Sequence, residues 1–205
     1  MLRWIQAALY DRSERASEDA GLRDERHRLL AGAHGVTVEV GAGTGLNLAH
    51  YSPEVDRLVL VEPDRHMARR LRRRAAELGV SAEVLDAMAE DLPLPTDSVD
   101  TAVVTFVLCS VPDPAAALRE VARVLRPGGS LLFAEHVRSA EPELAARQDR
   151  EPFPYRWLGC HPNRETLRTI TESPLVVEEV AHGEVPRAPE LERPMVLGVA
   201  RLPER

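Results

Sequence analysis

Short apolar runs alternate with longer amphipathic segments along the middle of the chain. The runs carry valine and leucine at consecutive positions, which is typical of parallel strands that are buried on both faces. They predict strands at residues 36–40, 57–62, 82–85, 99–106 and 130–135. Because strands of this kind alternate with helices, we expect right-handed βαβ units and an α/β fold with a doubly wound, mostly parallel sheet.

The amphipathic segments between the runs place apolar residues at helical spacing. They predict helices at residues 2–9, 20–31, 64–78, 114–125 and 164–171, and the opening of a helix at 46–50. Asp64 and Asp113 stand at expected N-cap positions, and Pro127 ends the helix that precedes it. Residues 149–162, rich in proline and aromatic side chains, predict irregular structure.

The first predicted strand runs into a glycine turn, Gly41-Ala42-Gly43-Thr44-Gly45. Glycine lets the backbone approach a ligand where a Cβ atom would collide. The second predicted strand ends on Glu62-Pro63, and a carboxylate at that tip can accept both hydrogen bonds of a ribose diol. The two features together predict a site for a cofactor that carries adenosine.

The spacing of the glycines bears on which cofactor this is. Dinucleotide sites use G-x-G-x-x-G, whereas this turn is G-x-G-x-G with Leu46 at the position of the expected third glycine. Glu39 is a carboxylate inside an otherwise apolar strand, and it would repel a pyrophosphate. It could help to hold an ammonium group, directly or through loop amides and water, or it could simply brace the loop amides. S-adenosylmethionine, with an amino group, a ribose and no phosphate, fits this turn better than NAD.

Several further segments resemble class I S-adenosylmethionine-dependent methyltransferases. The acidic stretch at residues 86–95, the strand lead-in at 97–105 and the turn Leu125-Arg126-Pro127-Gly128-Gly129 occur in the family's order and spacing, over residues 35–137. More narrowly, residues 107–111, Glu135-His136-Val137 and Gly159-Cys160 are similar to methyltransferase-like proteins that include thiol S-methyltransferases. The eukaryotic members of that group carry a membrane anchor that we do not expect here.

The resemblance implies a Rossmann-like sheet of seven strands that ends in an antiparallel hairpin at residues 175–180 and 195–200. It implies one domain over residues 1–205, with a helical cap (1–34), a cofactor-binding core (35–137) and a segment that holds the substrate lid and the hairpin (138–205). S-adenosylmethionine is then the cofactor and S-adenosylhomocysteine the product. A small molecule is the expected methyl acceptor.

The carboxyl ends of parallel strands meet at one edge of a sheet, so residues that follow the strands are expected to surround the cofactor. Met88 stands where the family commonly has an acidic residue, and we expect it to pack on the adenine while Asp86 or Glu90 accepts the amino hydrogen; Glu90 could equally belong to a solvated loop. The expected cofactor-binding residues are Tyr10, Glu39, Gly41, Ala42, Gly43, Gly45, Glu62, Pro63, Met88, Ala89, Glu90, Thr105, Phe106 and Val107.

His136 closes the fifth predicted strand, where an acceptor would approach, and is the expected catalytic base; a purely structural role is the alternative. His161 is a weaker candidate, and Cys109 is expected to be a small buried residue. A thiol acceptor near a sulfonium could react as its thiolate, whereas an amine or a phenol would need a base.

Aromatic side chains concentrate in a chain that is only 4% aromatic at Phe153, Tyr155 and Trp157, beside Arg156. This cluster predicts a substrate lid, or else packing of the C-terminal hairpin onto the sheet.

Composition excludes some partners. The net charge of −7 argues against nucleic acid, and the arginines at 69–74 fit a solvated helix face. The two cysteines lack metal-ligand spacing and the N-terminus lacks a signal-peptide pattern, so we expect a cytoplasmic protein, monomeric or homodimeric, without a metal.

The leading function is methyl transfer to a small molecule. A thiol is the first acceptor, and oxygen or nitrogen of a natural product or quinone-like ring the second. Less favoured are a nicotinamide-dependent oxidoreductase and a non-catalytic module that binds the cofactor.

Overall fold

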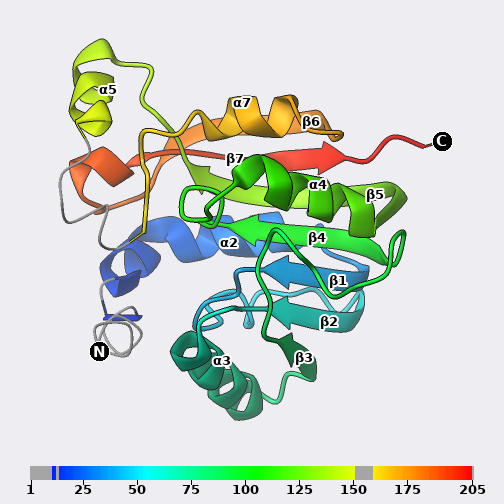
Figure 1. Ribbon diagram of the computed structural model, residues 1–205. Coiled ribbons are helices and arrows are strands. Elements are labelled where there is room, and N and C mark those ends of the chain that lie inside the picture. Colours follow the sequence, from blue (N-terminus) through cyan, green and yellow to red (C-terminus); the bar gives the residue numbers. More distant parts are fainter. Residues whose placement is uncertain (1–10, 13, 151–158, 205) are drawn as a thin grey trace.

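The computed structural model describes residues 11–12, 14–150 and 159–204. Within them one mixed sheet has the strand order β3-β2-β1-β4-β5-β7-β6 (Figure 1). The first five strands of the chain pair in parallel, and β7 lies antiparallel between β5 and β6. This confirms the predicted sheet and its C-terminal hairpin. The strands are β1 (Gly35–Val40), β2 (Val55–Val61), β3 (Ala82–Leu85), β4 (Val99–Thr105), β5 (Leu125–His136), β6 (Val176–Glu184) and β7 (Pro194–Arg201).

The helices predicted at residues 20–31, 64–78 and 114–125 are confirmed, and the helix predicted at 164–171 is shorter than expected. Two elements have no sequence counterpart, α5 and the short η2, while the helix expected at residues 2–9 lies outside the described residues. The helices are η1 (Glu18–Leu22), α2 (Arg23–Leu30), α3 (Arg65–Leu78), α4 (Pro114–Val124), α5 (Pro142–Asp149), α7 (Thr166–Thr171) and η2 (Glu190–Glu192). In the described part of the chain, no helix is long and apolar enough to cross a bilayer.

Side chains of the central strands alternate between two apolar layers, as the period of a strand requires. In β4, Val104 faces the layer that contains Leu118 of α4, whereas its neighbour Val103 packs with Leu30 of α2. In β2, Leu60 faces Leu71 of α3. Helices α2 and α3 therefore cover one face of the sheet and α4 covers the other, which leaves the carboxyl ends of the strands free to form a site.

The helix expected at residues 46–50 is wrong, because this segment forms consecutive turns. Gly45 adopts the left-handed region with φ of 85°, and a Cβ there would lie 2.7 Å from the side chains of Leu48 and Leu71. The amides of Leu48 and His50 bond to carbonyls three residues earlier instead of four. The side chain of Asn47 is buried and bonds to Arg26, Glu39 and Thr105.

Strand β5 begins at Leu125, five residues before its predicted start at Ser130. Leu125 already pairs with Val99 of β4, and regular pairing resumes at Ser130, so the residues between form a bulge. Gly128, with φ of 80°, donates its amide to Leu202 near the C-terminus. The Pro-Gly-Gly sequence therefore marks a bulge within a strand and not a turn that precedes one.

The fully buried amide of Gln148 in α5 joins the segments that follow β5. Its Oε1 accepts the backbone N–H of Ser139 at 2.7 Å. Its Nε2 donates to the carbonyls of Pro162 at 3.0 Å and Leu191 at 2.9 Å. This side chain thus ties α5 to the loop after Gly159 and to η2.

We expect the Gln148→Met variant, which keeps the side-chain volume, to lower the free energy of unfolding by about 3 kcal/mol, because each unpaired buried backbone group costs ~1–3 kcal/mol. Urea denaturation measures the change. Glu143→Ala, an exposed position of the same helix, is the control. A loss no larger than that of the control would contradict the role assigned to Gln148.

Candidate functional site

Two glycines in the turn after β1, Gly41 and Gly43, have different surroundings. Gly41 has φ of 69°, and a Cβ there would lie 2.5 Å from the side chain of Val107, which follows β4. Gly43 has φ of 57° and open space where a Cβ would stand. Gly41 therefore lets the turn pack against the end of β4, whereas Gly43 presents bare backbone to the space above the sheet.

Glu62, at the tip of β2, is 7% exposed and its two oxygens are held by backbone amides. The N–H of Gly43 donates to Oε2 and that of Asp64 donates to Oε1, both at 2.8 Å. Burial raises the pKa of Glu62, and these two hydrogen bonds partly oppose the rise. The carboxylate is thus fixed beside the glycine turn, and each oxygen keeps a lone pair for a ligand.

Glu39, inside β1, is 2% exposed and receives hydrogen bonds from two side chains. Asn47 Nδ2 donates to Oε1 at 2.9 Å and the Tyr51 hydroxyl donates to Oε2 at 2.6 Å. Burial raises the pKa of Glu39 to about 7, while the two donors and the nearby charge of Arg26 lower it. The buried carboxylate is thus only partly ionised near neutral pH.

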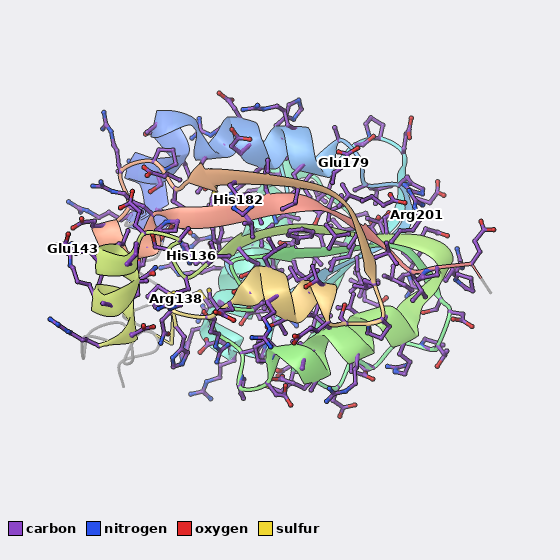
Figure 2. The ribbon with its side chains drawn as sticks, turned by 90° about the horizontal axis from the view of Figure 1, so that it is seen from above. His136, Arg138, Glu143, Glu179, His182 and Arg201 are labelled. Atoms are coloured by element: carbon purple, nitrogen blue, oxygen red, sulfur yellow. The ribbon has the colours of Figure 1, made fainter. Side chains whose placement is uncertain are left out.

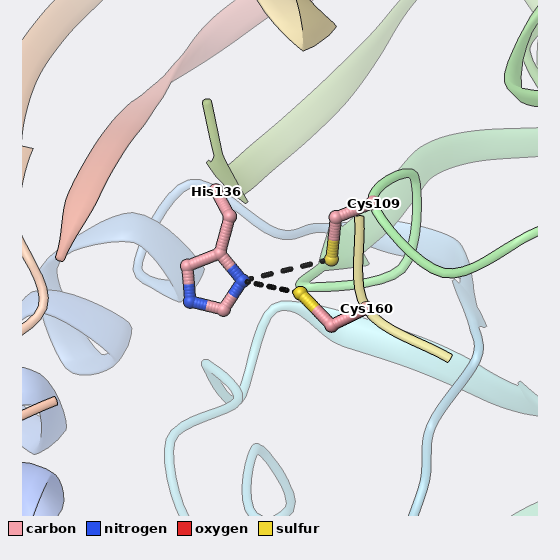
Figure 3. Close-up of side chains that lie close together, drawn as sticks. All are labelled: Cys109, His136 and Cys160. Carbon is pink, nitrogen blue, oxygen red and sulfur yellow. Dashed lines mark hydrogen bonds between the residues drawn. The ribbon is translucent and has the colours of Figure 1, made fainter. Parts of the chain in front are cut away.

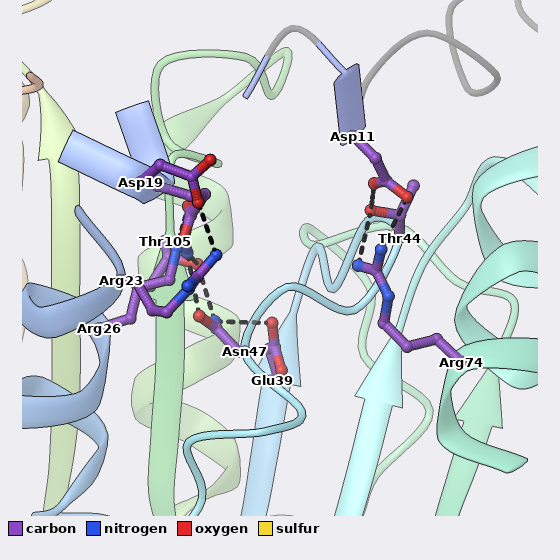
Figure 4. A network of polar contacts seen from close by, with 10 residues as sticks. Asp11, Asp19, Arg23, Arg26, Glu39, Thr44, Asn47, Arg74 and Thr105 are labelled. Carbon is purple, nitrogen blue, oxygen red and sulfur yellow. Dashed lines mark hydrogen bonds and ion pairs between the residues drawn. The ribbon is translucent and has the colours of Figure 1, made fainter. Parts of the chain in front are cut away.

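Arg26 of α2 enters the site from the N-terminal segment, and it was not among the expected site residues. Its Nε bonds to Glu18 at 2.8 Å, and its Nη1 bonds to Asn47 Oδ1 at 2.9 Å (Figure 4). The guanidinium carbon lies 5.4 Å from the centre of the Phe106 ring. The sequence signal was present, because an arginine on the apolar face of a predicted helix has to be paired when it is buried.

A small cleft of about 20 Å³ opens between these groups. The volume is that of about one water molecule, and the wall carries an acidic and a basic side chain together with bare backbone. It is lined by Arg26, Glu39, Gly41, Ala42, Gly43, Thr44, Leu46, Asn47 and Thr105.

The N-terminal segment also reaches over the glycine turn at a second point. The Asp11 carboxylate accepts hydrogen bonds from the Thr44 hydroxyl and from Arg74 of α3, the latter at 2.7 Å (Figure 4). A residue that precedes β1 therefore contacts the turn. Tyr10, the other expected contact from this segment, lies outside the described residues.

The loop after β3 presents the residues expected around an adenine. Met88 is 45% exposed and Ala89 is buried. Glu90 Oε1 accepts the backbone N–H of Asp113 at 3.1 Å, and its Oε2 is buried without a hydrogen-bond partner among the described residues. Asp86 is exposed. Met88 thus offers an apolar surface, and Glu90 has one acceptor oxygen left for a donor.

The chain leaves β4 through Thr105, Phe106 and Val107. Phe106 has φ of 57°, a strained value for a residue with a side chain, and its amide bonds to Ala134 of β5 at 2.8 Å. Its ring lies 4.7 Å from the His136 ring and also faces Arg26. Phe106 therefore contacts one residue that lines the cleft and one residue at the end of β5.

Glu135 holds the loop after β4 in place. The carboxylate is fully buried and accepts the backbone N–H groups of Val107, Leu108 and Cys109 at 2.8–3.3 Å. Burial raises the pKa of Glu135 to about 7 against the effect of these hydrogen bonds. Because this one carboxylate of β5 binds three consecutive amides, it fixes the backbone conformation of the loop at Cys109.

The carbonyl side of the same loop is bound by the segment that follows Gly159. Arg164 Nη1 donates to the carbonyls of Leu108 and Val111, and the amide of His161 donates to the carbonyl of Cys109 at 2.8 Å. These contacts bring Cys160 to the end of β4, although it stands 51 positions after Cys109 in the chain.

Cys109, His136 and Cys160 meet at this junction (Figure 3). His136 Nδ1 lies 3.6 Å from the sulfur of each cysteine. The contact with Cys160 and burial raise the pKa of Cys109 well above its usual value. For His136, burial lowers the pKa, but the contact with Cys109 and the charges of Glu135 and Glu192 leave it raised overall.

The expected site residues within the described part of the chain lie at the carboxyl ends of β1, β2, β3, β4 and β5. Figure 2 shows His136 at one end of the sheet and Arg201 at the other. The expected lid residues Phe153, Tyr155, Arg156 and Trp157 lie outside the described residues. Sequence reasoning missed the approach of the two cysteines, because their spacing in the chain gave no sign of it.

Comparison with known proteins agrees with this geometry. A family model described as a methyltransferase domain matches residues 38–133. Human thiol S-methyltransferase TMT1A is 34% identical over 80% of this chain and 69% of its own length, and human TMT1B is 40% identical over 69% and 61%. Phosphatidylethanolamine N-methyltransferase of Cereibacter sphaeroides is 32% identical over 86% of both chains. The chain thus spans about two thirds of the length of its human relatives.

A solved structure shares the fold at low sequence identity. Geranyl diphosphate C-methyltransferase from Streptomyces coelicolor superimposes with a TM-score of 0.67 at 18% identity, over 89% of this chain and 76% of that one. The likeness concerns the arrangement of the strands and helices.

The raised pKa of Glu39 predicts a pH-dependent stability. Between the ordinary pKa of 4.5 and the folded value of about 7, the folded protein keeps a proton that the unfolded chain has released. The stability that this group contributes is therefore present below the lower value and is lost as the pH rises through about 7.

We expect Glu39→Gln to remove that part of the dependence, so that the unfolding free energy of the wild type falls relative to the variant as the pH rises. Urea titrations at several pH values measure both. Glu54→Gln, at an exposed position, should track the wild type. A constant difference between wild type and Glu39→Gln would contradict the raised pKa.

Proposed function

This chain belongs to the family of S-adenosylmethionine-dependent methyltransferases, and we propose that it transfers the methyl group to the sulfur of a small-molecule thiol. The observation that carries the cofactor assignment is the convergence of Glu39, Glu62 and Arg26 on the glycine turn. The support for the acceptor comes from the thiol S-methyltransferase relatives and from the groups gathered at the ends of β4 and β5.

The groups around the cleft beside the glycine turn suit the amino acid end of the cofactor, which would bind at the mouth of the cleft. Arg26 is positively charged and Glu39 is partly ionised near neutral pH, and these two groups complement a carboxylate and an ammonium group. The bare backbone at Gly43 gives close access to the same place. A pyrophosphate would meet the Glu39 carboxylate here, which argues against a dinucleotide.

The nucleoside end would extend toward β2 and β3. Glu62 is already oriented by two backbone amides, so its remaining lone pairs are preorganised for the two ribose hydroxyls. Met88 offers an exposed apolar surface for the adenine ring, and the unpartnered oxygen of Glu90 offers an acceptor for the adenine amino group. The expected role of Pro63 and Ala89 is to shape this wall.

The cofactor supplies the reactive methyl group on a sulfonium leaving group, and the protein supplies orientation, exclusion of water and handling of the acceptor's proton. Phe106 contacts both Arg26 beside the cleft and His136, so an acceptor bound at the end of β5 would approach the methyl group past the edge of this ring. We assign His136 the catalytic role on the acceptor. Cys109 and Cys160 contact its Nδ1 and fix the ring.

The described contacts also support separate roles for three consecutive parts of one domain, residues 1–205. Residues up to 34 cover the cofactor side through Asp11 and Arg26. Residues 35–137 carry the glycine turn and the strand ends, and residues 138–205 complete the acceptor side through Cys160 and the hairpin. We further propose a cytoplasmic protein, monomeric or homodimeric, that acts on small molecules and not on nucleic acid or membranes, in line with its net charge of −7.

N-methylation of an amine is the second candidate. The relative from Cereibacter sphaeroides is named as an N-methyltransferase and aligns over 86% of both chains. An amine acceptor has to lose a proton before or during the transfer, which would use His136 as a general base.

We expect Glu62→Gln to weaken the binding of S-adenosylhomocysteine about 10- to 100-fold, because a charged acceptor contributes ~1.5–3 kcal/mol to its hydrogen bonds. Isothermal titration calorimetry measures the dissociation constants. Glu77→Gln, on the exposed side of α3, is the matched control. NAD is titrated in parallel, and tight NAD binding without binding of S-adenosylhomocysteine would overturn the cofactor assignment.

Release of S-adenosylhomocysteine identifies the acceptor class. With simple alkyl thiols, primary amines and phenols at equal concentration, we expect the thiols to give the highest rate. Faster turnover with amines would replace this proposal by the second candidate. Absence of product with every acceptor, in a protein that binds the cofactor, would instead indicate a non-catalytic module.

A further inference from the structure

One nitrogen atom faces two sulfur atoms in the cluster at the ends of β4 and β5. His136 Nδ1 is 3.6 Å from Cys109 Sγ and 3.6 Å from Cys160 Sγ, and the three atoms all lie within 4.8 Å of one another (Figure 3). An imidazole nitrogen has one lone pair or one proton, so it satisfies one well-formed hydrogen bond. A single cation placed between the three atoms would satisfy all of them at once.

The spacing agrees with the edges of a tetrahedral zinc site. Zinc binds cysteine sulfur at about 2.3 Å and histidine nitrogen at about 2.0–2.1 Å, which separates a sulfur ligand from a nitrogen ligand by about 3.5 Å. Both separations in this cluster are 3.6 Å. Two thiolates and one imidazole are also a donor set that favours zinc and other thiophilic cations over magnesium or calcium.

We propose that Cys109, His136 and Cys160 form a binding site for one zinc ion, whose fourth position takes the sulfur of the acceptor. Three protein ligands and one open position are the pattern of a catalytic zinc site, whereas a structural site has four protein ligands. The ligands come from three segments that are far apart in the chain, which explains why no ligand spacing is visible in the sequence.

Two of the three ligands, Cys109 and His136, are held in place by contacts of their own. Glu135 and the amide of His161 fix the backbone of Cys109 from both sides. The hydroxyl of Thr166 donates to the carbonyl of His136 at 2.9 Å. Glu192 interacts electrostatically with the His136 ring, in the way that carboxylates near metal-binding histidines stabilise them. Such support is expected when three ligands have to be presented in a fixed geometry.

The role of the ion in catalysis rests on the proposed thiol S-methylation. The acceptor thiol would bind zinc with loss of its proton to solvent, and the sulfur would keep its electron pair as a zinc-bound thiolate. A lone pair on that sulfur then forms the new bond to the methyl carbon while the bond from the sulfonium to that carbon breaks, and its electrons stay on the leaving sulfur. The products are a neutral thioether and S-adenosylhomocysteine, with one proton released overall.

This assignment changes the role of His136 from a proton acceptor to a ligand. The zinc ion would stabilise the thiolate, so no side chain would have to act as a base. A disulfide between Cys109 and Cys160 is the competing use of the same two sulfurs, and both cysteines are free in this structure.

Metal binding is tested on the whole chain of 205 residues, reduced and stripped with a chelator. We expect it to bind one equivalent of zinc, measured by competition with a chromogenic chelator, and cobalt with the near-ultraviolet thiolate charge-transfer band and visible bands of a tetrahedral site. We expect Cys109→Ser, Cys160→Ser and His136→Gln each to weaken zinc binding by about 100-fold or more. His182→Gln, at an exposed histidine of β6, is the matched control.

The conservative Cys160→Ser change, at a partly exposed position, and circular dichroism of all variants separate loss of the site from loss of the fold. Failure of the reduced wild type to bind zinc stoichiometrically, or equal affinity in the ligand variants and the control, would overturn the site. Isolation of a Cys109–Cys160 disulfide that persists under the reducing conditions would overturn it as well.

The rate of thiol methylation by stripped and zinc-loaded protein tests the catalytic role separately. A rate that falls at least tenfold on stripping and returns with zinc supports acceptor binding at the ion. Stoichiometric zinc with an unchanged rate would overturn the acceptor role alone. Stoichiometric zinc without methylation of any thiol would overturn the proposed function while the metal site stands.

Discussion

Buried carboxylates at the ends of parallel strands are the constraint on which this structure depends. Where parallel strands end, backbone N–H groups point away from the sheet without strand partners and need acceptors. Glu62 after β2 and Glu135 in β5 supply these acceptors. Glu62 binds two backbone N–H groups and Glu135 binds three. Each carboxylate is buried at a cost that these bonds offset. The same bonds fix the turn and the loop that form the two halves of the site.

The part of the candidate site around the glycine turn, which we propose to bind the cofactor, was largely predictable because its residues are close together in the chain. Glycines follow one apolar strand, and a carboxylate follows the next, so a short window contains both the fold signal and the ligand signal. Glu39 stood out because a charged residue inside an apolar strand needs a partner. The side chains around Glu39 could not be predicted from this window. Asn47 lies in a segment whose sequence predicts a helix, and Arg26 comes from the preceding helix.

The acceptor half was not predictable by the same means. Cys109, His136 and Cys160 belong to three segments whose approach depends on Arg164, on the amide of His161 and on the unpredicted helix α5. None of these contacts leaves a periodic pattern. The resemblance to the group that includes thiol S-methyltransferases covers all three segments. The structure supplies a physical reason, since the three residues meet at one point.

The charge of the proposed zinc site with its bound acceptor is opposite to the charge of the cofactor sulfonium. The cofactor carries a sulfonium, and its positive charge disappears when the methyl group leaves. A zinc ion with two cysteine thiolates and a neutral imidazole has no net charge, and an acceptor thiolate on the fourth position makes the group singly negative. An anion opposite a cation in a site from which water is excluded attracts it strongly before transfer, and the transfer neutralises both. Arg26 already pairs with Glu18 and bonds to Asn47, so its guanidinium would compete less for the proposed anion than the sulfonium does.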